Sequence, residues 1–365
     1  MTRMTRRWIA AAIAGVACAC GAADAQEAKW RSEHDAGWQA YKDGHFAEAE
    51  RLLRAAEGTA MALGAEDPRL ATTLDHLAWV LCTQGKPADG EPLAKRALAI
   101  REKVLGADHP DVAKSVNTLA CLYDMEGKTA EARTLHERHL VLTEKVQGKD
   151  HPRVATILDN LATVHHVLRQ DAEAEAAYKR ALAIREKAAS EKPVELAPTL
   201  YNLGTLYLDQ GKFSDAEPLL NRALVLREKA LGPEHPDVAT SLEALGWLYA
   251  KQGKNAEAEP LLKRAISIYQ ATLGADHPHV ARCCAKMAHA CCAQGKNAEA
   301  ESCCKQAISV FEKSPQAADP AIYAKALEEY AKVLRSTNRP EEAEKAETRA
   351  KAIRASERKV QGRSE

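Results

Sequence analysis

The sequence predicts an all-α fold, a right-handed solenoid (superhelix) of about eight antiparallel helix pairs. Three observations predict this fold. One motif recurs along nearly the whole chain, its prolines are spaced 42 residues apart, and the apolar residues between them fall three and four positions apart, as on one face of a helix. Because a single helix pair cannot bury its apolar face alone, neighbouring pairs are expected to stack.

The repeat is clearest in two segments of the chain. One begins at Leu105 and reads LGADHPDVAKSVNTLACLYDMEGKTAEARTLHERHLVLTEKV; the other begins at Leu231 and reads LGPEHPDVATSLEALGWLYAKQGKNAEAEPLLKRAISIYQAT. The two segments align without a gap. One proline of the 42-residue series is missing, and Pro193 stands one residue before its place. The regular prolines are Pro68, Pro110, Pro152, Pro236, Pro278 and Pro320. The expected repeat units are residues 30–62, 63–104, 105–146, 147–188, 189–230, 231–272, 273–314 and 315–356.

Each unit is expected to contain two helices of about 17 residues, roughly 25 Å long. The first helix should start at the proline, because proline is tolerated where the backbone N–H would be unpaired anyway, and it drives the preceding residue out of the helical region. The Asp-His-Pro linkers, such as 108–110, are therefore interpreted as helix starts and not as ligand pairs. The second helix should end at the next Leu-Gly, as at Leu105 and Gly106. The first helix should end at a glycine that can adopt the left-handed conformation, namely Gly85, Gly127, Gly211, Gly253 or Gly295.

Small residues recur at one position of each helix, which indicates close approach within a pair. The first helices contribute Ala78, Ala120, Ala162, Gly204, Gly246 and Ala288. The second helices contribute Gly90, Ala132, Ala174, Ala216, Ala258 and Ala300.

Residues 202–226, NLGTLYLDQGKFSDAEPLLNRALVL, resemble a tetratricopeptide repeat, and the LGxDHPxVA linkers and RALxIREK endings are similar to its kinesin-light-chain variety. The resemblance covers roughly residues 30–356. It implies the fold and a protein-interaction role without specifying the partner, because such repeats serve many unrelated partners. The last unit departs from the pattern, with Thr337 and Asn338 replacing the glycine turn, as a terminal cap with a polar outer face would.

The resemblance also implies that the first helix of each unit lines a concave groove that binds a peptide or protein partner. Asn160 and Asn202 occupy the place where similar proteins carry an asparagine that binds a peptide backbone, since an amide side chain both donates and accepts. Trp79 and Trp247 would add large apolar contacts. An alternative is that these are ordinary solvated helix residues. The expected partner-binding residues are Asn160, Asn202, Asn117, Trp79, Trp247, Tyr201 and His166, with Asp75, His76, Asp124 and Glu243 on the same face.

Charge and motifs disfavour several classes of function. Lys plus Arg and Asp plus Glu number 51 each, so no global field attracts nucleic acid. The sequence has no phosphate-binding loop, no nucleophile elbow and no Gly-rich dinucleotide turn, and HERH at 136–139 is not a zincin motif. We therefore expect a non-enzymatic protein without a cofactor.

Six of the ten cysteines lie within residues 283–304. Most of them replace large apolar residues of the preceding unit, so one interpretation is core filling. A second is a disulfide between Cys284 and Cys304, which are equally far from the turn at Gly295. A third is a metal site, which the helical CC spacing disfavours, so no metal ligand is predicted. A redox or metal-handling protein that uses the Cys283–Cys304 cluster is therefore the alternative function.

The N-terminus predicts export from a bacterial cytoplasm. A basic start with Arg6 and Arg7 precedes an apolar stretch, residues 8–19, too short to span a bilayer, and Ala23-Asp24-Ala25 resembles a cleavage site. Residues 1–25 are thus predicted to be a signal peptide, 26–356 the repeat domain and 357–365 a disordered polar tail. A periplasmic or secreted protein is expected, with a retained anchor or a lipoprotein as alternatives. The sequence does not decide between the general and the twin-arginine export route. In a lipoprotein, the lipid anchor would be Cys20 or Cys18. No later segment is apolar enough to span a membrane.

Overall fold

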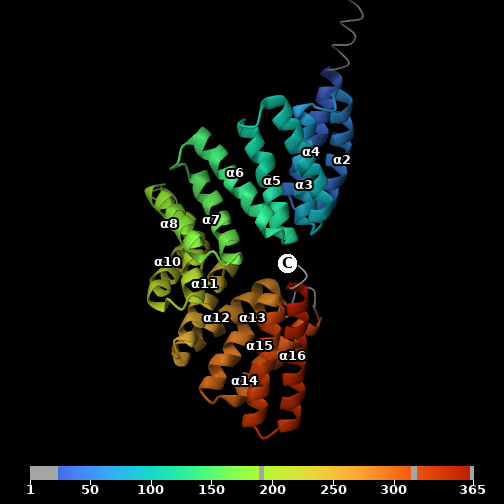
Figure 1. The fold of residues 1–365 in the computed structure, drawn as a ribbon. Helices are drawn as coiled ribbons and strands as arrows, with labels where there is room; N and C mark the ends of the chain where they lie inside the picture. The colour runs from blue at the N-terminus through green and yellow to red at the C-terminus, as the bar shows by residue number, and fades with distance from the viewer. Residues whose placement is uncertain (1–23, 189–192, 314–318, 362–365) are drawn as a thin grey trace, which may run out of the picture. The chain divides into compact units, whose positions relative to one another are not determined.

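The computed structural model describes residues 24–188, 193–313 and 319–361, with side chains through residue 356, and every regular element in these ranges is helical (Figure 1). Most of the predicted signal peptide, residues 1–23, lies outside the described residues. The chain divides into two compact units, Met1–Ile184 and Arg185–Glu365. Each unit is a series of antiparallel helix pairs, which confirms the predicted all-α repeat fold.

The first unit begins with a helix over residues 24–42. It continues with α2 (Phe46–Leu63), α3 (Pro68–Thr83), α4 (Pro87–Leu105), α5 (Pro110–Glu126), α6 (Thr129–Gln147), α7 (Pro152–Val167) and most of α8 (Asp171–Ala188). The second unit contains η1 (Pro193–Leu196), α9 (Ala197–Asp209), α10 (Phe213–Leu231), α11 (Pro236–Lys251), α12 (Asn255–Leu273), α13 (Pro278–Ala293), α14 (Asn297–Lys313), α15 (Pro320–Ser336) and α16 (Pro340–Gln361).

All six regular prolines are the first residues of helices, as predicted. The histidine before the proline caps the helix: Nδ1 of His109 accepts the Asp111 backbone N–H at 3.1 Å, and Nδ1 of His277 accepts that of His279 at 3.2 Å. His151 and His235 do the same, whereas the carboxylates of Asp67 and Asp319 take this role at α3 and α15. The Asp-His-Pro linkers are therefore helix starts.

Two boundaries differ from the prediction. Pro193 begins a turn of 3₁₀ helix, and the α-helix starts only at Ala197, because Pro193 stands one residue early in the 42-residue series. Helix α16 continues to Gln361, so part of the segment predicted to be a disordered tail is helical. The helical part, residues 357–361, contains no glycine or proline, and its Glu, Arg and Lys residues are good helix formers.

The predicted glycine turns are present. The C-cap Gly127 has φ 72° and ψ 15°, the left-handed conformation, and the other four turn glycines also have positive φ. Arg169 and Asn338, both with φ 61°, take this conformation in the two turns that lack glycine. These turns reverse the chain between the first and second helix of each pair.

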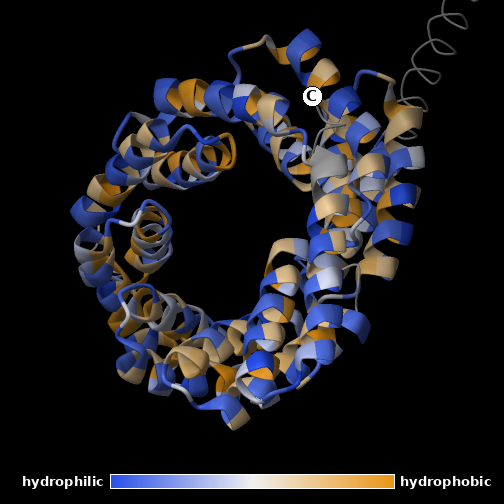
Figure 2. Ribbon diagram, turned by 60° about the horizontal axis from the view of Figure 1, so that its bottom comes forward, coloured by the Kyte–Doolittle hydropathy of each residue, from blue (hydrophilic) through white to orange (hydrophobic). Residues whose placement is uncertain are grey.

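The columns of small residues lie where the paired helices meet. All their alanines are fully buried, and a Cβ added to Gly246 would lie 2.7 Å from Cγ of Leu262. The same contact recurs one repeat earlier, between Gly204 and Leu220, at 2.8 Å. Figure 2 shows apolar and polar segments alternating along the helices, as expected when each buries one side.

Candidate functional site

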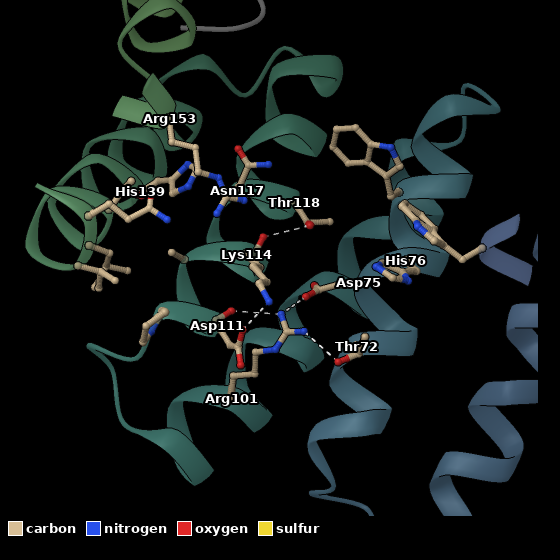
Figure 3. A pocket seen from close by; sticks show the side chains of 18 residues that line it. Thr72, Asp75, His76, Arg101, Asp111, Lys114, Asn117, Thr118, His139 and Arg153 are labelled. Atoms are coloured by element: carbon tan, nitrogen blue, oxygen red, sulfur yellow. Dashed lines mark hydrogen bonds and ion pairs between the residues drawn. The ribbon is translucent and has the colours of Figure 1, made fainter. Parts of the chain in front are cut away.

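A pocket with a volume of about 650 Å³ lies within the first unit and opens between α3, α5 and α7 (Figure 3). Most of its lining comes from the first helices of successive pairs, with second helices α4 and α6 adding to it. We call it the α3–α5 pocket. It is lined by Trp38, Thr72, Asp75, His76, Trp79, Arg101, Pro110, Asp111, Ala113, Lys114, Asn117, Thr118, His139, Leu142, Thr143, Val146, Gln147 and Arg153.

A buried ion pair occupies one end of the pocket. Nη1 of Arg101, on α4, donates to Oδ2 of Asp75 on α3, and to Oγ of Ser115 on α5 at 2.6 Å. The Ser115 hydroxyl donates to the same Asp75 oxygen at 2.7 Å. Three successive helices are thereby joined at one carboxylate, and Figure 3 shows Asp75 and Arg101 pointing toward one another.

Only one of the two Asp75 carboxylate oxygens has hydrogen-bond partners. Burial raises its pKa to about 6, although the charge of Arg101 opposes this shift. Its second oxygen, Oδ1, is buried and has no hydrogen-bond partner among the described residues. An orphaned buried acceptor costs roughly 1–3 kcal/mol, so a ligand donor that reached this oxygen would be favoured.

Aromatic rings from the first two helix pairs form the pocket wall nearest the N-terminus. The His76 ring stacks on Trp38 with centroids 3.9 Å apart, and its Nδ1 lies 2.9 Å from Nε2 of His34. Burial lowers the pKa of His76 to about 3, so the ring is neutral at physiological pH. Nε1 of Trp79 donates to the Tyr41 hydroxyl at 2.7 Å, which fixes the indole orientation.

The opposite wall is polar and comes from α5, α6 and α7. Lys114 pairs with Asp111 at 2.6 Å, and Asn117 lies one turn further along α5. His139, on α6, is 8% exposed, and burial lowers its pKa to about 4, with Arg153 acting in the same direction. Its Nδ1 is a second buried atom without a hydrogen-bond partner in the described part of the chain.

Trp79 and Asn117 are the two predicted site residues that line the α3–α5 pocket. Asn160 lies half-buried on α7, outside the pocket lining. His166 lies in the last turn of α7, where its Nδ1 is 3.1 Å from Oδ1 of Asp171. Of the four predicted site residues in the first unit, two therefore line the pocket and two lie outside it.

The other three predicted residues lie in the second unit. Tyr201 and Asn202 are half-buried on α9, and the Arg227 guanidinium lies 4.9 Å from the Tyr201 ring centroid. Trp247, on α11, has the Lys251 ammonium 4.7 Å from its ring centroid. Tyr201 and Trp247 therefore contact cationic side chains of their own unit, and none of the three residues lines the α3–α5 pocket.

Glu243 is the counterpart of Asp75 four repeats later, and both of its carboxylate oxygens have hydrogen-bond partners. Oε1 accepts from Arg282 at 2.7 Å and from Lys286 at 2.8 Å, and Oε2 accepts from Arg282 at 2.8 Å and from Tyr269 at 3.3 Å. Burial alone would raise the pKa of Glu243, but these cations outweigh it and hold the pKa at about 2. Asp75, unlike Glu243, thus keeps an orphaned carboxylate oxygen.

Among the basic residues and histidines of the pocket, the sequence analysis missed Arg101, Lys114, His139 and Arg153. A signal for Arg101 existed, because Arg227 occupies the same place in the RALxIREK ending and donates to Ser241, 14 residues later, as Arg101 does to Ser115. His139 was set aside with the HERH motif. No comparable signal marks Lys114 or Arg153.

All eight cysteines in the described ranges are free. Cys283, Cys284, Cys291 and Cys304 are buried, as the core-filling interpretation requires. The disulfide predicted between Cys284 and Cys304 stays a prediction, since in this structure the Cys284 thiol donates to Oε1 of Gln306 at 3.4 Å. No group of three or more His, Cys, Asp or Glu side chains in the described segments is arranged to hold a metal ion. Nor does any helix in these segments have the length and apolar character needed to cross a membrane.

A family model described as tetratricopeptide repeat matches residues 69–140, 126–187, 195–271, 249–313 and 281–356. Comparison with curated proteins gives no match.

Solved structures show the same fold. BtubC (BKLC) from P. vanneervenii is 26% identical, with 68% of this chain and 93% of that chain covered and a TM-score of 0.51. Nearly identical TPR-like repeats of the kinesin light chain type from Podosopora anserina are 25% identical, with 56% and 97% covered and a TM-score of 0.50. A Rap protein complexed with competence and sporulation factor is 13% identical, with 90% and 98% covered and a TM-score of 0.57, a likeness of fold alone.

Proposed function

Since the chain belongs to the tetratricopeptide repeat family, we propose that it is a non-enzymatic scaffold that binds an extended peptide segment of a protein partner in the α3–α5 pocket. The observation that carries this proposal is the pair of orphaned polar atoms, Oδ1 of Asp75 and Nδ1 of His139, buried in a pocket that also offers Asn117 and Trp79.

A peptide backbone offers hydrogen-bond partners, which these two orphaned atoms lack. Its N–H groups can donate to Asp75 Oδ1, and the Asn117 amide can donate to a carbonyl and accept from an N–H at once. Trp79 and Trp38 offer apolar surface to a side chain of the same segment. Three cations, Arg101, Lys114 and Arg153, face two carboxylates, so the pocket is close to electrically balanced and suits a backbone better than a highly charged ligand.

The pocket histidines support a binding role over a catalytic one. A general acid or base works best with a pKa near the operating pH. Burial lowers the pKa of His76 to about 3 and of His139 to about 4, so both are weak bases at neutral pH.

We propose further that the scaffold works outside the cytoplasm. The support is the leader-like sequence of residues 1–25. Mass spectrometry of the N-terminus of protein isolated from its native cells would test this. We expect the mature chain to start at Gln26; a lipid-modified Cys20 or Cys18 would favour the lipoprotein alternative, and an intact leader would contradict cleavage of a signal peptide.

The binding proposal can be tested with peptides selected from a random display library on the full-length protein. Isothermal titration should give at least ten-fold weaker binding for Asn117→Ala and for Trp79→Ala, because each removes a pocket contact. Trp247→Ala is the matched control in the second unit and should leave the affinity unchanged. Circular dichroism checks that each variant is folded. Equal affinity of wild type and Asn117→Ala would exclude the pocket as the peptide site.

A further inference from the structure

The two oxygens of the Asp75 carboxylate have different surroundings. Oδ2 accepts from Nη1 of Arg101 and, at 2.7 Å, from the Ser115 hydroxyl, so both of its lone pairs are in use. Oδ1 is buried and has no hydrogen-bond partner in the described part of the chain. A proton that Asp75 takes up therefore goes to Oδ1, and it turns this acceptor into a donor.

We propose that Asp75 accepts a backbone N–H of the bound peptide through Oδ1 and does so only when it is ionised, so that peptide binding releases a proton and weakens as the pH falls. The inference rests on the proposed function, because it concerns the same α3–α5 pocket, which Asp75 lines (Figure 3). It adds the ligand atom that Asp75 recognises and the control of binding by pH.

The free protein holds an ionised Asp75 at a cost. The residue is 5% exposed, and an acceptor left unpaired in such a place has lost its water without gaining a partner. Burial accordingly raises the pKa of Asp75 to about 6, although Arg101 opposes the shift. A peptide N–H that reached Oδ1 would stabilise the ionised form and lower this pKa. A group whose pKa falls on binding gives up its proton to the solvent.

The charged groups that face Asp75 belong to α4 and α5. Arg101, on α4, keeps its charge at every pH considered, and it also donates to the Ser115 hydroxyl at 2.6 Å. Lys114, on α5, forms an ion pair with Asp111 at 2.6 Å, and this contact lowers the pKa of Asp111. Asp111 therefore stays ionised between pH 5 and 7.5.

The histidines around the pocket are neutral in the same range. Burial lowers the pKa of His76, the residue after Asp75, to about 3, and that of His139, on α6, to about 4. Nε2 of His34, on the first helix, lies 2.9 Å from Nδ1 of His76, and His34 is not part of the pocket lining. Among the carboxylates and histidines that line the pocket, this leaves Asp75 as the group that exchanges a proton between pH 5 and 7.5.

Peptide affinity should therefore rise with pH. Only the ionised fraction of Asp75 is competent to bind, and with a pKa of about 6 this fraction is about one-tenth at pH 5 and nearly complete at pH 7.5. Binding should be about ten-fold weaker at pH 5 than at pH 7.5. At pH 6, where Asp75 is half protonated, each bound peptide should release about half a proton, and at pH 8 close to none.

Isothermal titration of the full-length protein with a library-selected peptide measures both quantities. The peptide contains no histidine or acidic residue and has blocked termini, so it exchanges no proton of its own in this range. Titrations at pH 5 and 7.5 give the two affinities, and titrations at pH 6 in two buffers of different ionisation enthalpy give the number of protons released. Circular dichroism checks that the protein is folded at each pH. These measurements are made on the wild type and depend on no variant.

Asp75→Asn gives a second, independent measurement. Its amide oxygen can accept from Arg101 and Ser115, and its amide nitrogen then stands in the place of Oδ1 as a permanent donor, like the protonated carboxyl group. We expect this variant to bind about ten-fold more weakly than wild type at pH 7.5 and equally weakly at pH 5. Asp276→Asn, which removes an exposed carboxylate paired with Lys313 at 2.8 Å, is the control and should keep both the affinity and its pH dependence.

Three results would each overturn the role of Asp75: equal wild-type affinity at pH 5 and 7.5, no proton release at pH 6, or wild-type pH dependence in Asp75→Asn. If Asn117→Ala and Trp79→Ala still weaken binding in that case, the peptide site stands and only the proton coupling is wrong. A peptide that binds those two variants as it binds wild type lies outside the pocket, and that result would overturn both proposals.

Discussion

At the residue scale, Glu243 shows how neighbours decide the behaviour of a buried charge. It is 2% exposed, yet its pKa is held at about 2 because Arg282 and Lys286 outweigh the effect of burial. Asp75, its counterpart in the first unit, has its pKa raised to about 6. The same repeat position thus holds a stabilising carboxylate in one unit and an incompletely paired one in the other.

Glu243→Gln is expected to lower the free energy of unfolding by about 3 kcal/mol at pH 7, since the pKa lies below its ordinary value of 4.5. A depressed carboxylate pKa stabilises above pH 4.5, and this contribution is lost as the pH falls toward 2. The difference from wild type should therefore shrink at pH 3, as measured by urea denaturation. Glu102→Gln, in a half-exposed pair with Arg138, is the control and should cost less than about 1 kcal/mol. A Glu243→Gln deficit that stays the same at both pH values would contradict this account.

The histidine caps make a second prediction at this scale. His235→Ala removes the acceptor for the Asp237 N–H and should destabilise the protein by about 1 kcal/mol. His235→Asp should retain the stability, because Asp67 caps α3 in the same way. Thermal denaturation of the two variants checks this, and equal losses would show that the cap hydrogen bond contributes nothing.

At the scale of helices, the close approach within each pair depends on small residues. Gly246→Ala would place a Cβ 2.7 Å from Cγ of Leu262, so the Leu262 side chain or one of the two helices must shift. We expect a loss of about 1–3 kcal/mol, typical of overpacking. Gly58→Ala is the matched control, because nothing lies within 4 Å of its added Cβ and alanine favours a helix. Chemical denaturation should show the two substitutions changing stability in opposite directions, and a stabilised Gly246→Ala would contradict close packing at this position.

Consecutive second helices are joined by a repeating ion pair. An arginine pairs at 2.6 Å with a glutamate 36 residues earlier, in Arg138–Glu102, Arg180–Glu144, Arg222–Glu186 and Arg264–Glu228. These side chains are partly solvated, so each pair contributes little to stability. The ion pairs recur because neighbouring helix pairs have the same geometry. They are a consequence of that geometry and not its cause.

At the scale of the whole molecule, the sequence was sufficient for the architecture because each helix carries its own local signals. Proline, the capping residue before it and the turn glycine fix the helix boundaries. The prediction of an α-helix start failed at Pro193, because a shift of one residue breaks that local pattern. The candidate site was only partly predictable. Trp79 and Asn117 follow from the face of the first helix, but Arg101 and His139 reach the pocket from second helices. The burial of both side chains and the lowered pKa of His139 depend on neighbouring repeats, which local patterns do not describe.

The central claim is that a partner peptide occupies the α3–α5 pocket, and site-specific photo-cross-linking tests it most directly. A photoreactive residue at Lys114 lies in the pocket, whereas one at Val141, 63% exposed on α6 and absent from the pocket lining, reports on the outer surface of the same unit. With a library-selected peptide, we predict a cross-link from position 114 and none from position 141. Cross-linking from position 141 alone would show that the peptide binds outside the pocket.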